Sequence, residues 1–272
     1  MSRFRSGFAI AVICAGCAGS KPADVNVLLR DADRLAWMTN WTAATPVFAR
    51  AEQIAGDAGD ARNALYARFG RLRGEMQLRP LPDISSEIAR DLDSPLARSD
   101  RWLRLRGLTT KADIDLEWDV QSAHDTWQQV LELATELQHE GWVNRAKGDL
   151  GMIAFLRGNS SEASAMVGQA LQTAVRSRDV AGQLRYLSAI GTGLLMAGDP
   201  RASLGYIEKA LALAQSHPDT GFPYPANSTK ILALLALKQP EQANCLVQMA
   251  LKQAASENSR IKEIELLATH HK

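Results

Sequence analysis

Apolar residues recur along this chain with the spacing of α-helices rather than of strands. Leu65, Phe69, Leu72 and Met76 stand at i, i+4, i+7 and i+11, which places them on one face of a helix. Ala and Leu, both strong helix formers, dominate the sequence, and long Val/Ile/Thr runs typical of strands are missing from it. The pattern therefore predicts an all-α protein.

The first hundred residues divide into short helices with recognisable breaks between them. A break is expected at Gly56-Asp57-Ala58-Gly59. Another is expected at Arg79-Pro80-Leu81-Pro82, because proline lacks an amide donor and disfavours helix in the residue before it. The expected helices span about 25–39, 42–55, 61–77 and 84–92, and a further one runs from Ser94-Pro95 through Leu105.

The second half of the chain repeats with a period of 40 residues. The pairs Ala170-Leu171, Ala210-Leu211 and Ala250-Leu251 share this spacing. Equivalent breaks fall in each unit, at Gly158-Asn159, Gly198-Asp199 and Gln239-Pro240. A fixed period of this length with helix-forming residues indicates a helical solenoid. The expected helices lie over 119–137, 141–156, 160–175, 180–196, 201–215, 222–237 and 241–255.

The small residues of the repeat carry a resemblance to a known family. Gly151 and Gly191 stand one period apart, in the first helix of two units. In the second helices small residues recur at two positions that are seven apart, namely Ala123, Ala163, Ser203 and Ala243, and then Ala170, Ala210 and Ala250. This arrangement resembles tetratricopeptide repeats, helix-turn-helix units in which small residues stand where helices touch.

The resemblance implies an α-α superhelix, a solenoid of antiparallel helical hairpins. It is strongest over 119–255. It departs from the family in its period, which is 40 rather than about 34 residues, and in lacking the proline that closes each unit. We expect residues 23–95 to form degenerate hairpins of the same solenoid, and residues 96–259 to form the regular array.

Residues 260–272 are expected to form a C-terminal capping helix. Ile261, Ile264, Leu267 and Ala268 have the spacing of one apolar stripe, which we expect to pack against the helix over 241–255. The last element of a solenoid must bury one flank and present a polar flank to solvent, and one amphipathic helix does both.

The N-terminus has the features of a secretory signal. Arg3 and Arg5 precede a short apolar run that is too short to span a bilayer. The residues Ile13-Cys14-Ala15-Gly16-Cys17 resemble a bacterial lipobox, although Cys14 stands where an aliphatic residue is usual. The resemblance implies lipidation of Cys17 and a lipid-anchored protein of the bacterial envelope, with 1–22 as signal and tether. A secreted or periplasmic form without lipid is the alternative.

Charge and cysteine content exclude several classes of function. The formal net charge is +1, so no overall field favours nucleic acid, and we expect no nucleic-acid partner. Cys17 carrying a lipid would leave Cys245 as a single thiol in the mature chain, which we expect to be a small packed residue of a helix.

The charged and histidine residues form no recognisable catalytic or metal-binding motif. Asp113, Asp115, Glu117 and Asp119 lack the glycine and terminal glutamate of a calcium loop, and are expected to be a solvated stretch. The arginines around Trp102, which are Arg98, Arg101, Arg104 and Arg106, are expected on a solvated helix face or in ion pairs between repeats. We therefore expect no enzyme activity, no metal and no cofactor.

The resemblance places a binding surface on the inner face of the solenoid. In tetratricopeptide arrays this face is lined by first-helix residues that are not used in packing. By register these residues are Arg145, Met152, Phe155, Arg185, Ser188, Thr192 and Leu195. Arg145 and Arg185 are one period apart, and two guanidinium groups could hold a carboxylate or an acidic segment. The alternative is that both are ordinary exposed arginines, and that Met152, Phe155 and Leu195 are buried by the adjacent helix instead of forming an apolar floor.

We therefore expect a non-catalytic scaffold that binds a peptide or protein partner in its concave groove. Two alternatives remain open at this stage. Similar helical arrays in bacteria precede signalling output domains, so this chain could be a sensor or regulatory region. Some helical arrays are enzymes that use the groove as an active site, and an isolated Glu in a pocket with a perturbed pKa would support that alternative.

Overall fold

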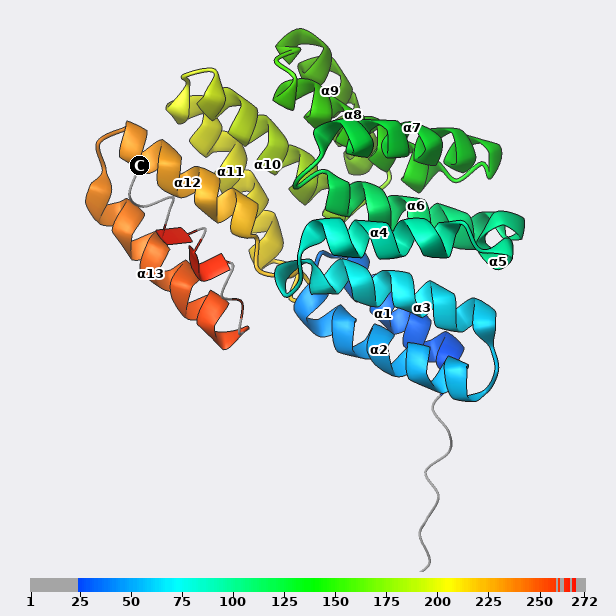
Figure 1. The fold of residues 1–272 in the computed structure, drawn as a ribbon. Helices are drawn as coiled ribbons and strands as arrows, with labels where there is room; N and C mark the ends of the chain where they lie inside the picture. The colour runs from blue at the N-terminus through cyan, green and yellow to red at the C-terminus, as the bar shows by residue number, and fades with distance from the viewer. Residues whose placement is uncertain (1–23, 258, 260–261, 265, 268–272) are drawn as a thin grey trace, which may run out of the picture.

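Helices build the whole of the described structure. The computed structural model describes residues 24–257, 259, 262–264 and 266–267, and these residues contain helices and no strand (Figure 1). The prediction of an all-α superhelix is confirmed. The elements are α1 (Val25–Trp37), α2 (Trp41–Asp57), α3 (Ala61–Gly74), the 3-10 helix η1 (Glu75–Gln77), α4 (Leu81–Leu92), α5 (Pro95–Ser99), α6 (Arg101–Asp115), α7 (Val120–Glu136), α8 (Glu140–Leu156), α9 (Ser160–Arg176), α10 (Val180–Met196), α11 (Pro200–Gln215), α12 (Tyr224–Ala236) and α13 (Pro240–Ser256).

Consecutive helices pair and the pairs stack side by side. The pairs are α1 with α2, α2 with α3, α6 with α7, α8 with α9, α10 with α11, and α12 with α13, and α4 packs mainly on α6. Helices of neighbouring pairs are also in contact, namely α3 with α6 and α10 with α12. The stack curves, so that the first helices lie toward one another on its inner side (Figure 1). This curvature creates the inner face on which the candidate site lies.

The 40-residue period is present in the geometry of the second helices. These begin at Val120, Ser160, Pro200 and Pro240. Gly158 and Gly198 adopt the expected left-handed conformation between paired helices, each with φ of 84°. The turns between pairs place non-glycine residues in the same region, with φ of 55° at Gln138 and 57° at Arg178, which the sequence did not indicate.

Small residues of the repeat bring paired helices into close contact. A Cβ on Gly151 would lie 2.8 Å from the Cβ of Met166 in α9, and one on Gly191 would lie 2.6 Å from Ile207 in α11. Ala170 is only 2% exposed within α9. A larger side chain at any of these positions would push the two helix axes apart.

One expected helix is divided in the structure. The segment from Ser94 forms α5 and α6 rather than one continuous helix, because Asp100 adopts an extended conformation with φ of −100° and ψ of 104°. Its carboxylate accepts a hydrogen bond from the Leu103 amide at 2.9 Å, which caps the new helix. The chain therefore begins a new helix, capped by this aspartate, instead of continuing the helix that starts after Ser94.

The apolar stripe expected near the C-terminus is wrong in its register. Residues 262–264 and 266–267 are helical, but Ile264 and Leu267 are 60% and 45% exposed. Leu266 is buried instead, in a cluster with residues of α12 and α13. Leu266 lies about 200° around the helix from Ile264, so a different face of this segment meets the array. Ile261 and Ala268 lie outside the described residues.

The expectation of a packed thiol is also wrong, since Cys245 is exposed. The buried residues of α13 follow the spacing i, i+4, i+7 and i+11, at Ala243, Val247, Ala250 and Ala254. Cys245 is two positions from Ala243 and therefore points away from that face.

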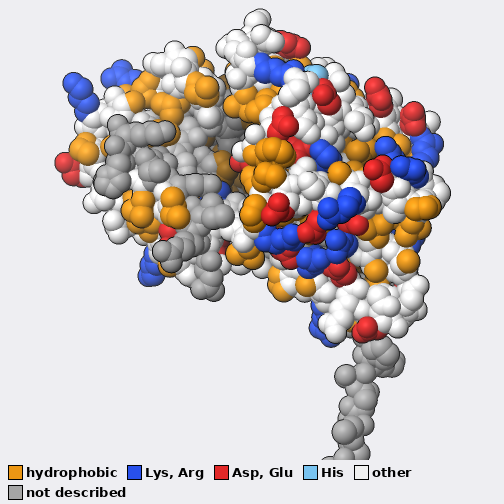
Figure 2. Space-filling model, in the orientation of Figure 1, with side chains coloured by type: hydrophobic (Ala, Val, Ile, Leu, Met, Phe, Trp, Pro, Cys, Tyr) orange, Lys and Arg blue, Asp and Glu red, His pale blue; other side chains and the backbone are white. Residues whose placement is uncertain are grey.

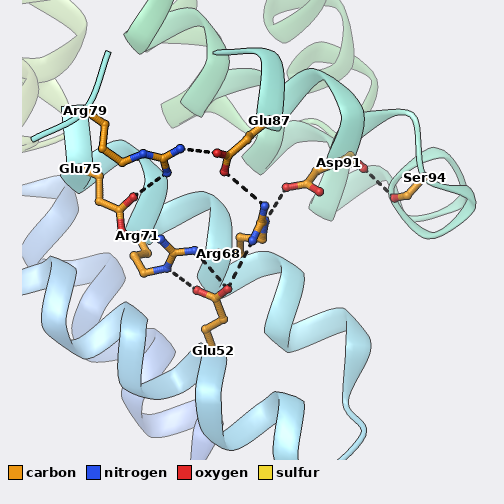
Figure 3. A network of polar contacts seen from close by, with 8 residues as sticks. All are labelled: Glu52, Arg68, Arg71, Glu75, Arg79, Glu87, Asp91 and Ser94. Carbon is orange, nitrogen blue, oxygen red and sulfur yellow. Dashed lines mark hydrogen bonds and ion pairs between the residues drawn. The ribbon is translucent and has the colours of Figure 1, made fainter. Parts of the chain in front are cut away.

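A chain of ion pairs ties α2, α3 and α4 together on the molecular surface. Glu52 of α2 accepts from Nε of Arg71 at 2.6 Å, and Asp91 of α4 accepts from Nε of Arg68 at 2.7 Å (Figure 3). Glu87 joins Arg68, at 3.3 Å, to Arg79. Figure 2 shows charged side chains of both signs gathered over α3 and α4. Shared partners hold each side chain in place, so such a network stabilises more than isolated surface pairs do.

The close contact between paired helices leads to a stability prediction. Ala170→Leu should lower the free energy of unfolding by about 1–3 kcal/mol, because the added carbons have no space between α8 and α9. Urea unfolding followed by circular dichroism measures the change. Ala165→Leu is the matched control, since Ala165 is exposed on the same helix. Equal stability of the two variants would contradict this account of the repeat.

Candidate binding site on the inner face

The array curves until its first hairpin touches its later ones. The indole Nε1 of Trp37, at the end of α1, donates to Asp179 Oδ1 at 3.0 Å, across 142 positions of sequence. The rings of Trp37 and Trp142 meet edge to face with centroids 5.2 Å apart. The loop between α11 and α12 also reaches the turn after α1, where Gly221 donates to the Met38 carbonyl at 3.2 Å (Figure 1).

Only glycine fits at this last contact. A Cβ on Gly221 would lie 2.4 Å from the carbonyl oxygen of Thr39 and 2.9 Å from the Cα of Asn40. Both of these are backbone atoms that cannot rotate away. The contact between the two ends of the curve therefore depends on a glycine in the longest loop of the repeat region.

The curved array surrounds a cavity of about 270 Å³ on its inner side. The cavity lies among α1, α3, α6 and α8, so its walls come from distant parts of the sequence. Its lining is rich in aromatic and charged side chains: Asp33, Ala36, Trp37, Trp41, Tyr66, Arg73, Arg106, Thr109, Thr110, Asp113, His139, Trp142 and Arg145.

Arg145 occupies the wall of this cavity rather than an open groove. Its side chain is 11% exposed, and its Nη2 donates to Asp113 Oδ1 at 2.7 Å while its Nε donates to Asp149 Oδ2 at 3.2 Å. The guanidinium also lies 5.4 Å from the ring centroids of Trp127 and of Trp142. The expectation that Arg145 is available to bind a partner's carboxylate is therefore corrected, because its guanidinium group is already paired with carboxylates of its own chain.

Arg185 belongs to the same set of charges. Its Nη1 lies 3.6 Å from Asp149 Oδ1, so the two arginines of the repeat share one carboxylate that is 1% exposed. Asp113 in turn joins Arg145 to Arg73 of α3, at 3.1 Å. An alternating row of charges thus links α3, α6, α8 and α10 across the inner face.

The charges of this row shift the pKa values of its members. Burial raises the pKa of Asp113, but the attraction of Arg145 and Arg73 outweighs it and holds that pKa below its ordinary value. Burial lowers the pKa of Arg145, and the carboxylates of Asp113 and Asp149 outweigh this and raise it. Both groups therefore stay ionised within the protein.

Asp33 behaves differently from Asp113. Burial raises its pKa, and the nearby Arg106 offsets this only in part. The hydroxyl of Tyr66 donates to Asp33 Oδ2 at 2.8 Å, and burial is the largest cause that raises the pKa of this tyrosine to about 12. Asp33 is thus the carboxylate of the cavity that binds a proton most readily.

The first two carboxylates of the acidic stretch that was expected in solvent are buried. Asp113 is 8% exposed and Asp115 is fully buried. Asp115 accepts hydrogen bonds from Ser85 Oγ at 2.6 Å and from Ser122 Oγ at 2.7 Å. Asp113 and Asp115 belong to α6, where hydrogen bonds and ion pairs compensate the buried carboxylates. Glu117 lies beyond the end of α6 and is exposed as expected, and Asp119 caps α7.

The other predicted groove residues gather on the second half of the inner face. The described side chains of Met152, Phe155, Ser188, Thr192 and Leu195 are all half-buried. The Phe155 ring lies against α10, because a Cβ on Gly193 would be 3.1 Å from it. Thr192 Oγ1 lies 2.9 Å from Thr229 Oγ1 of α12. Met152 and Phe155 pack against a buried cluster of α9 and α10 residues. The five residues therefore lie on α8 and α10, outside the lining of the cavity.

Several cavity residues of the N-terminal hairpins escaped the sequence analysis. Asp33 and Trp37 in α1, Trp41 in α2, and Tyr66 and Arg73 in α3 all line the cavity. The signal available was their spacing, since Asp33 and Trp37 are four apart and Tyr66 and Arg73 are seven apart, each pair on one helix face. The sequence pattern did not indicate that these faces of α1 and α3 lie beside the repeats, because that proximity depends on the curvature of the array.

Metal-binding side chains are scattered in the part of the chain that the structure describes. Among them no group of three or more His, Cys, Asp or Glu side chains is placed to hold a metal ion. His139 is the N-cap of α8, where its Nδ1 accepts from the Trp142 amide at 3.2 Å.

Comparison with known proteins identifies no relative. No protein-family model matches the sequence, and no curated protein is similar to it at a level that indicates common ancestry. The resemblance to tetratricopeptide repeats therefore rests on the small residues and their spacing described above.

The charge row leads to a prediction about acid stability. Because the pKa of Asp113 is lowered in the folded state, its contribution is full above its unfolded pKa of about 4 and is lost as the pH falls further. Asp113→Asn should destabilise the protein by about 3–5 kcal/mol at neutral pH, since the buried arginines lose their shared anion.

Urea unfolding between pH 7 and pH 2.5 tests this, and the difference between wild type and variant should shrink as the pH falls below about 4. Asp93→Asn is the control, because Asp93 forms an exposed pair with Arg98 at 3.1 Å and should change stability by less than about 1 kcal/mol. If the difference in unfolding free energy between wild type and Asp113→Asn stays constant with pH, the charge of the Asp113 carboxylate does not stabilise the protein.

Proposed function

We propose that the protein is a non-catalytic binding module that holds a peptide or protein partner along the second half of its inner face. The single observation that carries this proposal is the half-buried set Met152, Phe155, Ser188, Thr192 and Leu195, which offers apolar and hydroxyl groups side by side on α8 and α10. Helical solenoids bind mostly through concave surfaces of this kind.

Exposed apolar residues extend this surface toward its rim. Leu156 ends α8 and is 56% exposed, and Met196 ends α10 and is 68% exposed. They stand one period apart, so they are neighbours on the array. Contiguous apolar surface on a folded protein marks a site of interaction more often than chance. The partner surface we propose consists of these two residues and the five named above.

Arg145 and Arg185 support this surface without forming part of it. Their guanidinium groups are held by Asp113 and Asp149, which fixes α8 and α10 relative to α6. Such fixation lowers the ordering cost of binding, because the helices that carry the partner surface are already in place. The two arginines therefore position the helices that carry the partner surface, and they do not contact the partner themselves.

The proposed place of the protein is the bacterial cell envelope, with lipid on Cys17. The lipobox-like segment lies outside the described residues, and the proposal rests on its sequence alone. Among the helices of the described part, none is both long and apolar enough to cross a membrane. Stable anchoring by lipid requires two acyl chains or more.

A regulatory role, in which the array senses a ligand, is the second candidate function. It is favoured by one observation, the polar and aromatic cavity of about 270 Å³ among the first hairpins. A scaffold that binds its partner only through the surface on α8 and α10 does not require such a cavity.

The partner proposal is tested by a charge placed on the proposed surface. Leu195→Asp should abolish capture of protein partners from detergent-solubilised envelopes, because an ionised carboxylate would be desolvated at the interface. Mass spectrometry of the captured proteins is the measurement. Val175→Asp is the matched control, since Val175 is 54% exposed near the end of the outer helix α9. Identical captured sets for both variants and wild type would refute the proposal.

The anchoring proposal is tested on the N-terminus. The intact mass of membrane-extracted protein should correspond to a chain that begins at Cys17 with its acyl groups. Cys17→Ala should move the protein from the membrane fraction to the supernatant. An unmodified chain beginning at Met1 or Ser2 would contradict lipidation, whatever the outcome of the partner experiment.

A further inference from the structure

The contact between the two ends of the curve differs in kind from the contacts between neighbouring helices. Neighbouring helices share buried apolar clusters, such as the one around Phe48 that joins α1, α2 and α3, and the one around Val167 that joins α8, α9 and α10. Among the described residues, no apolar cluster joins α1 or α2 to α10 or to the loop between α11 and α12. Polar groups and one pair of aromatic rings make this closing contact instead.

The loop between α11 and α12 holds the turn after α1 through three polar interactions. The Gly221 amide donates to the Met38 carbonyl, and Nδ2 of Asn40 donates to the Asp219 carbonyl, each at 3.2 Å. Nη1 of Arg34 pairs with the carboxylate of Asp219. The two side chains of this ion pair are 53% and 57% exposed, so solvent weakens their attraction. Contacts that are polar and exposed open more readily than buried apolar ones.

Trp37 covers part of the inner face next to this loop contact. Its indole donates to Asp179 and its ring meets that of Trp142. Trp37 also borders a small pocket whose other walls come from the beginnings of α8 and α10, namely Arg145, Asp179, Ala181, Gly182, Arg185 and Tyr186. The start of α10 is therefore shielded by a residue that lies far from it in the sequence.

The acceptor of the Trp37 indole keeps a partner when the indole leaves. Oδ1 of Asp179 also accepts from the Gly182 amide at 3.1 Å, as the N-cap of α10. This cap bond joins residues three apart, so it persists whether or not Trp37 is in place. Departure of Trp37 therefore leaves no unsatisfied carboxylate on the inner face.

We propose that the loop between α11 and α12 is a releasable clasp that holds Trp37 over the inner face. When the clasp opens, Trp37 moves away from α8 and α10. In the closed state Ala181 and Gly182 are buried beside Trp37. Opening adds the beginning of α10 to the surface that a partner can reach. This consequence for a partner rests on the proposed function, whereas the clasp itself does not.

Gly221→Ala is the variant that opens the clasp. A Cβ at this position would lie 2.4 Å from the carbonyl oxygen of Thr39, a backbone atom. Gly221 does not have a positive φ, so alanine strains this contact and not the conformation of the loop. Gly205→Ala is the matched control, because a Cβ on Gly205 in α11 would meet nothing within 4 Å.

Two measurements on the full-length protein in detergent follow Trp37 and the face that it covers. The first is fluorine NMR of protein labelled with fluorotryptophan, in which Trp37→Phe assigns the Trp37 resonance. The resonance of Trp127, which is fully buried, reports that a variant is folded. The second is the rate at which phenylglyoxal modifies Arg185, which is 21% exposed, read by mass spectrometry with the exposed Arg176 as internal reference.

In Gly221→Ala the Trp37 resonance should acquire the solvent isotope shift of an exposed indole. Modification of Arg185 should become faster by about threefold or more, because the open state is more populated. Both readouts should keep their wild-type values in Gly205→Ala.

Exchange of the ion pair covers the case that Gly221→Ala does not fold. Asp219→Arg places two cations at the clasp, so it should change both readouts in the same direction as Gly221→Ala. Arg34→Asp combined with Asp219→Arg restores the attraction and should return both readouts toward wild type. Wild-type readouts in a folded Gly221→Ala variant, or in Asp219→Arg where Gly221→Ala does not fold, would overturn the proposal. These results do not depend on the effect of Leu195→Asp on partner capture, so the two proposals fail separately.

Discussion

The close approach of paired helices at small residues is the constraint on which the rest of the structure depends. Gly151 and Gly191 leave room for Met166 and Ile207 of the second helices, at distances that no side chain at the glycines would permit. The same contact, repeated every 40 residues, gives each pair the same displacement from the last. A constant displacement produces a curved stack, and the curvature brings Trp37 of α1 against Trp142 of α8.

Buried charge holds the inner side of this curve together where apolar contact does not. Asp113 and Asp149 each lie between two arginines, so α3, α6, α8 and α10 are joined by ion pairs. Removing one member would leave its neighbours buried and unpaired, which is why such groups act as a unit. The network on α2, α3 and α4 has a similar role on the outer surface, where solvent weakens each pair (Figure 3).

The inner face therefore has two parts with different chemistry. The first hairpins line a cavity with aromatic rings and with charged side chains of both signs. The later hairpins present the half-buried apolar and hydroxyl groups around Phe155 and Thr192. Both parts include α8, so a ligand in the cavity and a partner on the rim would contact the same helix.

The sequence by itself determined the helices, their period and the small residues at their contacts, because these follow from local propensity and from spacing along one helix. It also placed Met152 and Thr192, and Phe155 and Leu195, one period apart on the first helices of two units. Only the tertiary structure decided that Arg145 is satisfied within the chain and that Asp33, Tyr66 and Arg106 meet beside it. Those contacts form because the small displacements between successive hairpins add up along the array and bring distant helices together. No local pattern in the sequence indicates how large the total displacement is.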